Sequence, residues 1–457
     1  MPLTNAALET PQELSRNGRF LVLAAAFLGW LCSGMQMAVM NLATGAAVGE
    51  FVQAGTLDES PGLRWERLVP GERRKEDAQR AAGELKDLAK SQTPRWFARF
   101  NSAFLLGAAC GGLVFGWIGD RFGRVRAMAL SIVCYSLFAG LAYVAQTAEQ
   151  LLVLRFLSAL GVGGMWPSGV SLASEAWSDV SRPFLSGLIG MSANLGIVLM
   201  GVIGMIYDIK PESWRWLLLI AATPALLGVG VWFVVPESPG WLAAQRRPNS
   251  RAEALPLLAV FRPPLLRLTL LGIALGAIPL LGGWGVTAWL IPWTDQVLGA
   301  ADPTAKALTS IMRAAGGSLG SLLGGWLANQ MGRRLTYFLI SLTTLAISEF
   351  IYFQLAPDDR FFSHLVFAVG FVSTIFFGWL PLYLPELFPT AARATGTGVS
   401  FNFGRILTAI GVLGTGVVTT AFGSDYAAAG RVTSLVYALG MVVILFAPDT
   451  TGRKMRD

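Results

Sequence analysis

Apolar runs of about 20 residues recur along the whole chain, and this feature constrains the fold more than any other. A helical run of that length matches the hydrocarbon thickness of a bilayer. A spanning segment must satisfy its own backbone hydrogen bonds, whereas a membrane barrel would show short alternating segments. The pattern predicts an all-α membrane protein with twelve transmembrane helices, at about residues 20–47, 99–119, 127–146, 150–174, 183–207, 214–235, 268–294, 304–328, 335–355, 361–384, 395–421 and 428–447.

The charged residues support a membrane protein and argue against a large, very apolar soluble protein. They make up 14% of the chain, whereas a soluble domain carries roughly 25%. They gather between Phe51 and Ala98, where nine Lys or Arg and eight Asp or Glu occur. Within this island the stretch Pro70 to Gln92 has helical composition and few apolar anchors. We expect a solvated extracytoplasmic helix there, with a partner-binding segment as the alternative.

The short loops predict the orientation, because Lys and Arg concentrate on the cytoplasmic side of a membrane protein. The loops on one side carry many arginines, and those on the other carry little more than Lys210, Lys306, Arg360 and Arg431. Both termini are therefore predicted to be cytoplasmic. The arginine-rich side includes Arg16, Arg19, Arg121, Arg124, Arg126, Arg182, Arg246, Arg247, Arg251, Arg262, Arg267, Arg333, Arg334, Arg393, Arg453 and Arg456.

The two halves of the chain resemble each other at the same kind of position. Gly116-Trp117 with Gly123-Arg124 recurs as Gly325-Trp326 with Gly332-Arg333, and Glu175 with Arg182 recurs as Glu386 with Arg393. Parallel repeats of this kind place a binding site between the halves near the membrane midplane. The predicted organisation is a cytoplasmic N-terminus 1–19, an N-terminal six-helix bundle 20–235 with an extracytoplasmic insertion 48–98, a cytoplasmic central loop 236–267, a C-terminal six-helix bundle 268–447 and a cytoplasmic C-terminus 448–457.

Several motifs resemble the major facilitator superfamily. The stretch from Gly119 to Arg124 (GDRFGR) is similar to its signature between the second and third helices, and Arg155 followed by spaced glycines is similar to its fourth-helix motif. The segments PESPGWL, PELFPT and PDTTG, from Pro236, Pro385 and Pro448, resemble the sugar-porter and metabolite–proton symporter branch. The resemblance implies alternating access, in which a gating charge network holds and releases the cytoplasmic helix ends: Asp120, Arg121, Arg124, Arg155, Glu175, Arg182, Glu386 and Arg393.

Three departures separate this chain from a typical sugar porter. The predicted seventh helix lacks the glutamine pair that is usual in sugar porters. The residues around Gln36 in the predicted first helix lack the aspartate that the resemblance associates with the coupling proton. Gly190 also stands where the fifth-helix glutamine is expected. A hexose substrate and coupling through the first helix are therefore not implied.

Polar and aromatic residues within the apolar segments are the candidates for substrate binding. An ionisable residue inside the membrane is costly and marks a functional site by default. Arg405 and Arg313 are such residues, with pairing to a neighbouring helix or snorkelling as the alternative. Carboxylates inside helices are scarce, so an organic anion fits slightly better than a neutral sugar. The predicted substrate-binding set is Arg405, Arg313, Trp284, Trp379, Gln36, Asn194 and Asn402.

Other activities find no support in the sequence. The single His364 has no catalytic or metal-binding company, no Walker-type lysine follows the Gly-rich stretches, and the basic residues are scattered over loops. We therefore expect no enzyme activity, no cofactor or metal and no nucleic-acid partner. The predicted protein is a monomer in the bilayer of an inner or plasma membrane, moving a small organic anion or sugar-like metabolite with protons. The alternatives are a facilitative sugar uniporter and a transporter-like sensor without flux.

Overall fold

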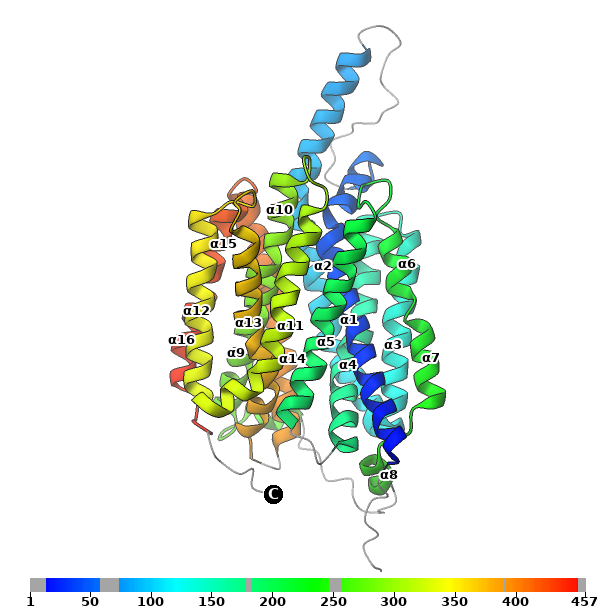
Figure 1. The fold of residues 1–457 in the computed structure, drawn as a ribbon, viewed down its shortest axis with the longest axis vertical. Coiled ribbons are helices and arrows are strands. Elements are labelled where there is room, and N and C mark those ends of the chain that lie inside the picture. The colour runs from blue at the N-terminus through cyan, green and yellow to red at the C-terminus, as the bar shows by residue number, and fades with distance from the viewer. Residues whose placement is uncertain (1–13, 58–73, 178–181, 246–256, 390–391, 451–457) are drawn as a thin grey trace, which may run out of the picture.

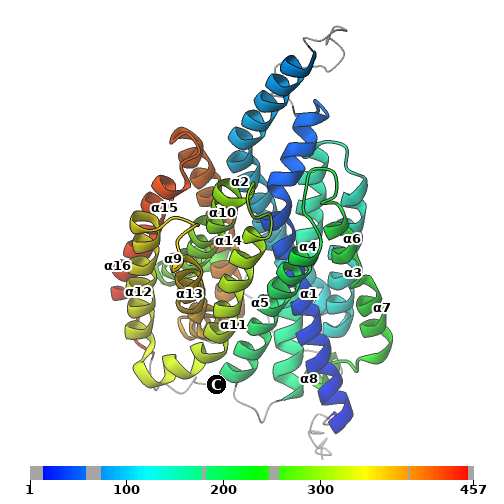
Figure 2. The same cartoon turned by 45° about the horizontal axis from the view of Figure 1, so that its top comes forward.

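The computed structural model describes residues 14–57, 74–177, 182–245, 257–389 and 392–450. These residues form helices and their connections, arranged as two bundles that lie side by side (Figures 1 and 2). The first bundle contains α1 (Arg16–Gln53), α2 (Arg74–Phe122), α3 (Arg124–Leu141) with the 3₁₀ turn η2 (Ala142–Val144), α4 (Ala148–Ala176), α5 (Arg182–Ile206), α6 (Trp216–Ala222) and α7 (Ala225–Val234).

The second bundle follows a cytoplasmic-side connection that contains α8 (Pro239–Gln245) and η3 (Leu257–Phe261). Its first membrane segment is broken into α9 (Leu266–Leu281), η4 (Gly282–Val286), η5 (Thr287–Trp289) and α10 (Leu290–Leu298). The others are α11 (Ala305–Met331), α12 (Arg333–Gln354), α13 (Phe362–Glu386), α14 (Arg393–Ala421), α15 (Tyr426–Ser434) and α16 (Val436–Leu445).

Eleven helical segments of the described chain are long and apolar enough to cross a membrane. The twelfth predicted segment is α11, which has 27 residues and packs in the bundle against α5 and α13. It is less apolar because Lys306, Arg313 and many glycines and serines lie along it. The predicted segments thus match helices in order, and the predicted all-helical fold is confirmed.

The described parts of the charged island are mostly helical, and its residues 58–73 lie outside the described residues. Helix α1 continues to Gln53, and α2 begins at Arg74 and runs unbroken through Pro94 to Phe122. The N-terminal part of α2 projects beyond the bundles at the end opposite α8 (Figure 1). The predicted helix in the stretch 70–92 is therefore present from Arg74 onward, and it is continuous with the second membrane helix.

Glycines let the helices approach closely at several crossings. A Cβ on Gly111 of α2 would lie 1.9 Å from the carbonyl oxygen of Leu160 in α4. Gly316 and Gly320 of α11 are held in the same way against α13, where a Cβ would lie 2.1 Å from the backbone oxygens of Phe367 and Phe371. Small residues at such crossings are typical of membrane helix packing. Gly116, in the same spacing pattern as Gly112, faces open space and does not take part.

Candidate functional site

A cavity of about 160 Å³ lies between the two bundles. Its lining comes from α1, α2, α4 and α5 on one side and from the α9–η5 segment, α11, α13 and α14 on the other. Trp30, Ser321 and Pro381 belong to the parts of their helices nearer the arginine-rich end, so the cavity extends from the middle of the bundles toward that end. A site between two repeat-related bundles agrees with the position that internal repeats predict.

The helix that enters the cavity from the second bundle is locally unwound. Gly282 to Val286 form a π-helical turn, and a 3₁₀ turn follows at Thr287 to Trp289. Single π-helical turns interrupt α-helices mostly at functional sites. The sequence GGWG around Trp284 supplies flexible backbone here, and Gly283, Trp284 and Thr287 all line the cavity.

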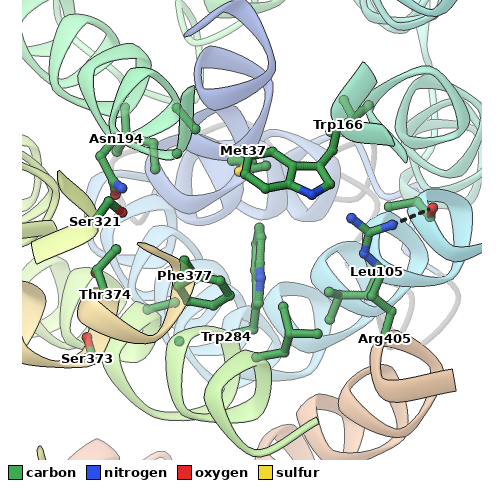
Figure 3. Close-up of a pocket in the computed structure, with 18 of the residues that line it drawn as sticks. Met37, Leu105, Trp166, Asn194, Trp284, Ser321, Ser373, Thr374, Phe377 and Arg405 are labelled. Atoms are coloured by element: carbon green, nitrogen blue, oxygen red, sulfur yellow. Dashed lines mark hydrogen bonds between the residues drawn. The ribbon is translucent and has the colours of Figure 1, made fainter. Parts of the chain in front are cut away.

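Arg405 of α14 borders the cavity and is held there by the backbone of the other bundle. Its Nη1 donates to the carbonyl oxygen of Ala108 at 3.0 Å (Figure 3). The same Nη1 donates to Oδ1 of Asn402 at 3.4 Å. The guanidinium lies over the Phe401 ring, 4.9 Å from its centroid. No carboxylate pairs with Arg405 among the described residues, so its charge is offset by carbonyl and ring dipoles alone.

Arg313 of α11 also lines the cavity, and its side chain forms fewer hydrogen bonds to the described residues than that of Arg405 does. Its Nε is buried, and none of its nitrogens has a hydrogen-bond or ion-pair partner among the described residues. The alternative of pairing with a neighbouring helix is met in part by Arg405, which donates to the Ala108 carbonyl of α2, and no such pairing is seen for Arg313 among the described residues. Both arginines place positive charge at the cavity, and their role in substrate binding stays a prediction.

Aromatic side chains form much of the cavity wall. Trp284 points into the opening, and its ring centroid lies 5.3 Å from that of Phe104 in the opposite bundle. The ring centroids of Trp166 and Trp30 lie 5.0 Å apart. Figure 3 shows Trp166 and Trp284 directed toward the same opening, with the Arg405 guanidinium beside them. Flat indole faces of this kind suit an unsaturated or aromatic ligand.

Across the opening from Arg405 lies a group of neutral polar side chains, Asn194, Ser321 and Thr374 (Figure 3). A Cβ on Gly317 of α11 would lie 2.8 Å from Asn194 Oδ1 and 2.9 Å from Thr374 Oγ1, so these groups meet where α5, α11 and α13 come together. The Ser321 hydroxyl is buried and has no partner in the described part of the chain. These residues can hydrogen-bond a polar ligand.

Three predicted substrate-binding residues lie outside the cavity lining. Trp379 lies on a different side of α13 from the cavity residue Phe377. It is therefore fully buried in the core of the second bundle, where it packs against Tyr337 and Tyr383. Its assignment to the cavity is corrected. Asn402 donates to the Gly398 carbonyl and accepts from Arg405, so it positions that arginine between α2 and α14.

Gln36 is the third residue outside the lining, because it turns into the first bundle. Its side-chain Nε2 donates to the Ala221 backbone carbonyl at 2.6 Å. The backbone carbonyl of Gln36 accepts from Arg155 Nη1 at 2.7 Å. Arg155 is buried over the face of Phe104, 4.3 Å from its centroid, and so lies behind a ring that lines the cavity. The pair therefore supports the cavity wall of the first bundle.

The charge network at the arginine-rich end is built within each bundle. In the first, Asp120 pairs with Arg124 at 2.7 Å, Glu237 accepts from the backbone N–H of Arg124 and Val125, and Glu175 accepts from the Ser238 hydroxyl. Glu237 thus satisfies backbone donors at the start of α3, where a negative charge is favourable. Arg121 stacks on Trp117 of its own helix.

The second bundle repeats this construction with equivalent residues. Glu386 pairs with Arg333 at 3.0 Å and accepts from the Thr450 hydroxyl at 2.5 Å, as Glu175 accepts from Ser238. Arg393 is the first residue of α14 and follows Glu386 closely in sequence. The side chain of Arg182 lies outside the side chains that the structure describes. The pairs that the structure describes join helices within a bundle, so pairing across the bundles stays a prediction for another state.

Neutralising Asp120 tests whether this network serves the change of state. Asp120→Asn is expected to lower the initial rate of uptake while leaving membrane abundance and melting temperature almost unchanged. The reason is that the side chain is 70% exposed, and exposed pairs contribute about 1 kcal/mol or less to stability. Asp208→Asn is the matched control, because Asp208 forms an exposed pair with Lys210 at the opposite end. Equal uptake rates for Asp120→Asn and Asp208→Asn would show that Asp120 has no gating role.

The opposite end of the bundles carries a charged contact that sequence reasoning missed. Lys306 is buried at the start of α11, where Nζ lies 3.0 Å from Asp295 Oδ1 of α10 and 3.5 Å from the Ile209 carbonyl oxygen of the first bundle. Asp295 also lies against α1, since a Cβ on Gly45 would be 2.9 Å from its Oδ2. These contacts join the two bundles at this end of the described structure. The only sequence signal was the placement of two opposite charges at neighbouring helix ends.

The chain matches known transporters along most of its length. The family model "Sugar (and other) transporter" matches residues 22–256, just over half of the chain. The cis,cis-muconate transport protein of Acinetobacter baylyi is 31% identical over 312 residues, which covers 67% of this chain and 74% of that protein. A probable 4-methylmuconolactone transporter of Cupriavidus pinatubonensis is 30% identical over 351 residues, covering 76% of this chain and 80% of that protein.

Solved structures agree on the fold. The D-xylose–proton symporter superimposes with a TM-score of 0.68 over 95% of this chain and 99% of that chain, at 17% identity. The relatives are transporters and not enzymes, and their multi-pass architecture agrees with a plasma-membrane location. The chain belongs to the sugar (and other) transporter family of the major facilitator superfamily, and it is a secondary transporter of small metabolites.

Proposed function

We propose that this transporter moves a small organic carboxylate, which binds in the central cavity with a carboxylate group at Arg405. The observation that carries the proposal is the charge of the cavity: two arginines line it, and none of its lining residues is Asp or Glu. A charged side chain inside a membrane protein is favourable only with a partner or water. A ligand carboxylate would supply that partner through charge-assisted hydrogen bonds, which are the strong ones.

The rest of the cavity suits a flat, unsaturated acid better than a sugar. Trp166, Trp284 and Phe104 present apolar ring faces, and a few hydroxyl and amide groups stand opposite. Two relatives named for transport of muconate and a methylmuconolactone handle compounds of this chemistry. We propose a functional monomer, because both sides of the cavity come from one chain, and we keep the bundle bounds 20–235 and 268–447 as proposed.

Proton coupling follows from the charge of the proposed substrate. Moving one negative charge inward against an inside-negative potential costs about 2.3 kcal/mol per 100 mV. We therefore propose that protons move inward with the anion in a number that offsets its charge. We expect uptake of cis,cis-muconate by proteoliposomes to exceed equilibrium under an inward proton gradient, and to return to equilibrium when a protonophore is added.

The outcomes of this experiment separate the alternatives. Flux that stops at equilibrium and ignores the protonophore would indicate a facilitator. Binding of muconate without any flux would indicate a sensor. Liposomes with the same lipid but no protein control for passive entry of the protonated acid, and uptake equal to theirs, with no binding, would contradict the proposal.

A further inference from the structure

The second cationic residue of the cavity has a defined setting on α11. Arg313, Gly317 and Ser321 are spaced by four residues and so share one face of the helix. The backbone of Arg313 packs directly on Gly370 of α13, where a Cβ would lie 2.1 Å from the Arg313 carbonyl oxygen. One turn further, Gly317 touches Asn194 and Thr374. Arg313 therefore belongs to the polar side of the cavity that contains Asn194, Ser321 and Thr374.

Arg313 is unusual because, among the described residues, no carboxylate pairs with its charge. Lys306, two turns earlier on the same helix, is buried with Asp295 at 3.0 Å. Arg313 has a buried Nε and no hydrogen-bond or ion-pair partner among the described residues, although it lines the same cavity as Arg405. An uncompensated charge in a low-dielectric interior is strongly unfavourable. An anionic group of a ligand would offset this cost.

The two arginines approach the cavity from different sides. Arg405 comes from α14 and is fixed to Ala108 of α2, whereas Arg313 comes from α11, between α5 and α13. Figure 3 shows the Arg405 guanidinium on one side of Trp166 and Trp284, and Asn194, Ser321 and Thr374 on the other. Arg313 lines the cavity from α11, whose next turns carry Gly317, which touches Asn194 and Thr374, and Ser321, so a second group that can bind an anion borders the cavity on a helix other than that of Arg405.

We propose that the cavity takes a dicarboxylate, with one carboxylate at Arg405 and the other at Arg313. This inference rests on the proposed function and goes one step further, since a monocarboxylate would leave one of the two cations without a partner. Arg313 is then a specificity-determining residue that favours diacids over monoacids.

The test compares two flexible acids that differ only in the second carboxylate, adipate and hexanoate. Their dissociation constants are measured by calorimetry on the detergent-purified full chain. In the unaltered protein adipate is expected to bind roughly tenfold or more tightly than hexanoate, because a hydrogen bond to a charged group contributes on that order. In Arg313→Gln the ratio is expected to fall to about one through the loss of adipate affinity.

Two further variants keep the result interpretable. Arg313→Lys retains the charge and should keep adipate preferred, and Arg313→Met repeats the neutralisation if the glutamine variant does not purify as a monodisperse protein. Hexanoate binding together with an affinity ratio of one in the unaltered protein would overturn the second subsite and leave the carboxylate assignment standing. A ratio that persists in both neutral variants would also overturn it. If neither acid binds and muconate uptake is absent as well, the proposed function itself fails.

Discussion

Replacing Arg405 by glutamine is expected to weaken carboxylate binding by roughly 10- to 150-fold. Arg405 supplies the charge on one side of the cavity, and a hydrogen bond to a charged group contributes about 1.5–3 kcal/mol. The melting temperature without ligand should change little, because removal of a buried guanidinium that lacks a carboxylate also removes its desolvation cost. Calorimetry and thermal unfolding of the purified variant measure the two quantities.

Arg360→Gln is the matched control for this change. Arg360 is exposed, stacks on Phe361 and is not among the residues that line the cavity. The Arg360→Gln variant should bind carboxylates with the same affinity as the unaltered protein. Equal affinities for Arg405→Gln and Arg360→Gln would show that Arg405 is structural. A large loss of stability in Arg405→Gln would point the same way.

Replacing Gly111 by valine is expected to cause the largest loss of stability. A Cβ at this position would lie 1.9 Å from the Leu160 carbonyl oxygen, so α2 and α4 would have to move apart. Overpacking of this kind costs about 3 kcal/mol or more when backbone rather than a flexible side chain is in the way. Size-exclusion chromatography and thermal unfolding should show little monodisperse protein and a sharply lower melting temperature.

Gly116→Val, on the same helix, is the control for valine as such. Nothing lies within 4 Å of the position that its Cβ would take, so its abundance and melting temperature should stay near those of the unaltered protein. If the two valine variants behave alike, the close approach of α2 and α4 at Gly111 does not hold the first bundle together.

The order of the helices could be predicted from sequence because bilayer thickness and backbone hydrogen bonding leave few choices. The packing at Gly111, Gly316 and Gly320 could also be predicted, since small residues four apart mark close crossings. The same spacing failed at Gly116. The contact partner of a glycine depends on which way its helix is rotated, and spacing alone does not determine that rotation.

The cavity residues were harder to predict for the same reason. On α13 the cavity side carries Ser373, Phe377 and Pro381, spaced by four residues, and Trp379 lies off this line in the core. A helix that is apolar all round gives no pattern from which to choose its face. Arg405 and Arg313 could be found, because an ionisable residue in an apolar segment stands out at any rotation.

The central claim is that the cavity recognises a negative charge, and thermal unfolding of the purified protein with a matched ligand pair tests it most directly. The pair is sorbate and its neutral amide, which share one carbon skeleton and differ in charge. Binding to the folded state raises the melting temperature, and the rise grows with the logarithm of ligand concentration divided by the dissociation constant. We predict that sorbate stabilises the protein, that its amide does not, and that the difference disappears in Arg405→Gln. Equal stabilisation by the amide, or stabilisation by neutral sugars that survives in Arg405→Gln, would contradict the account.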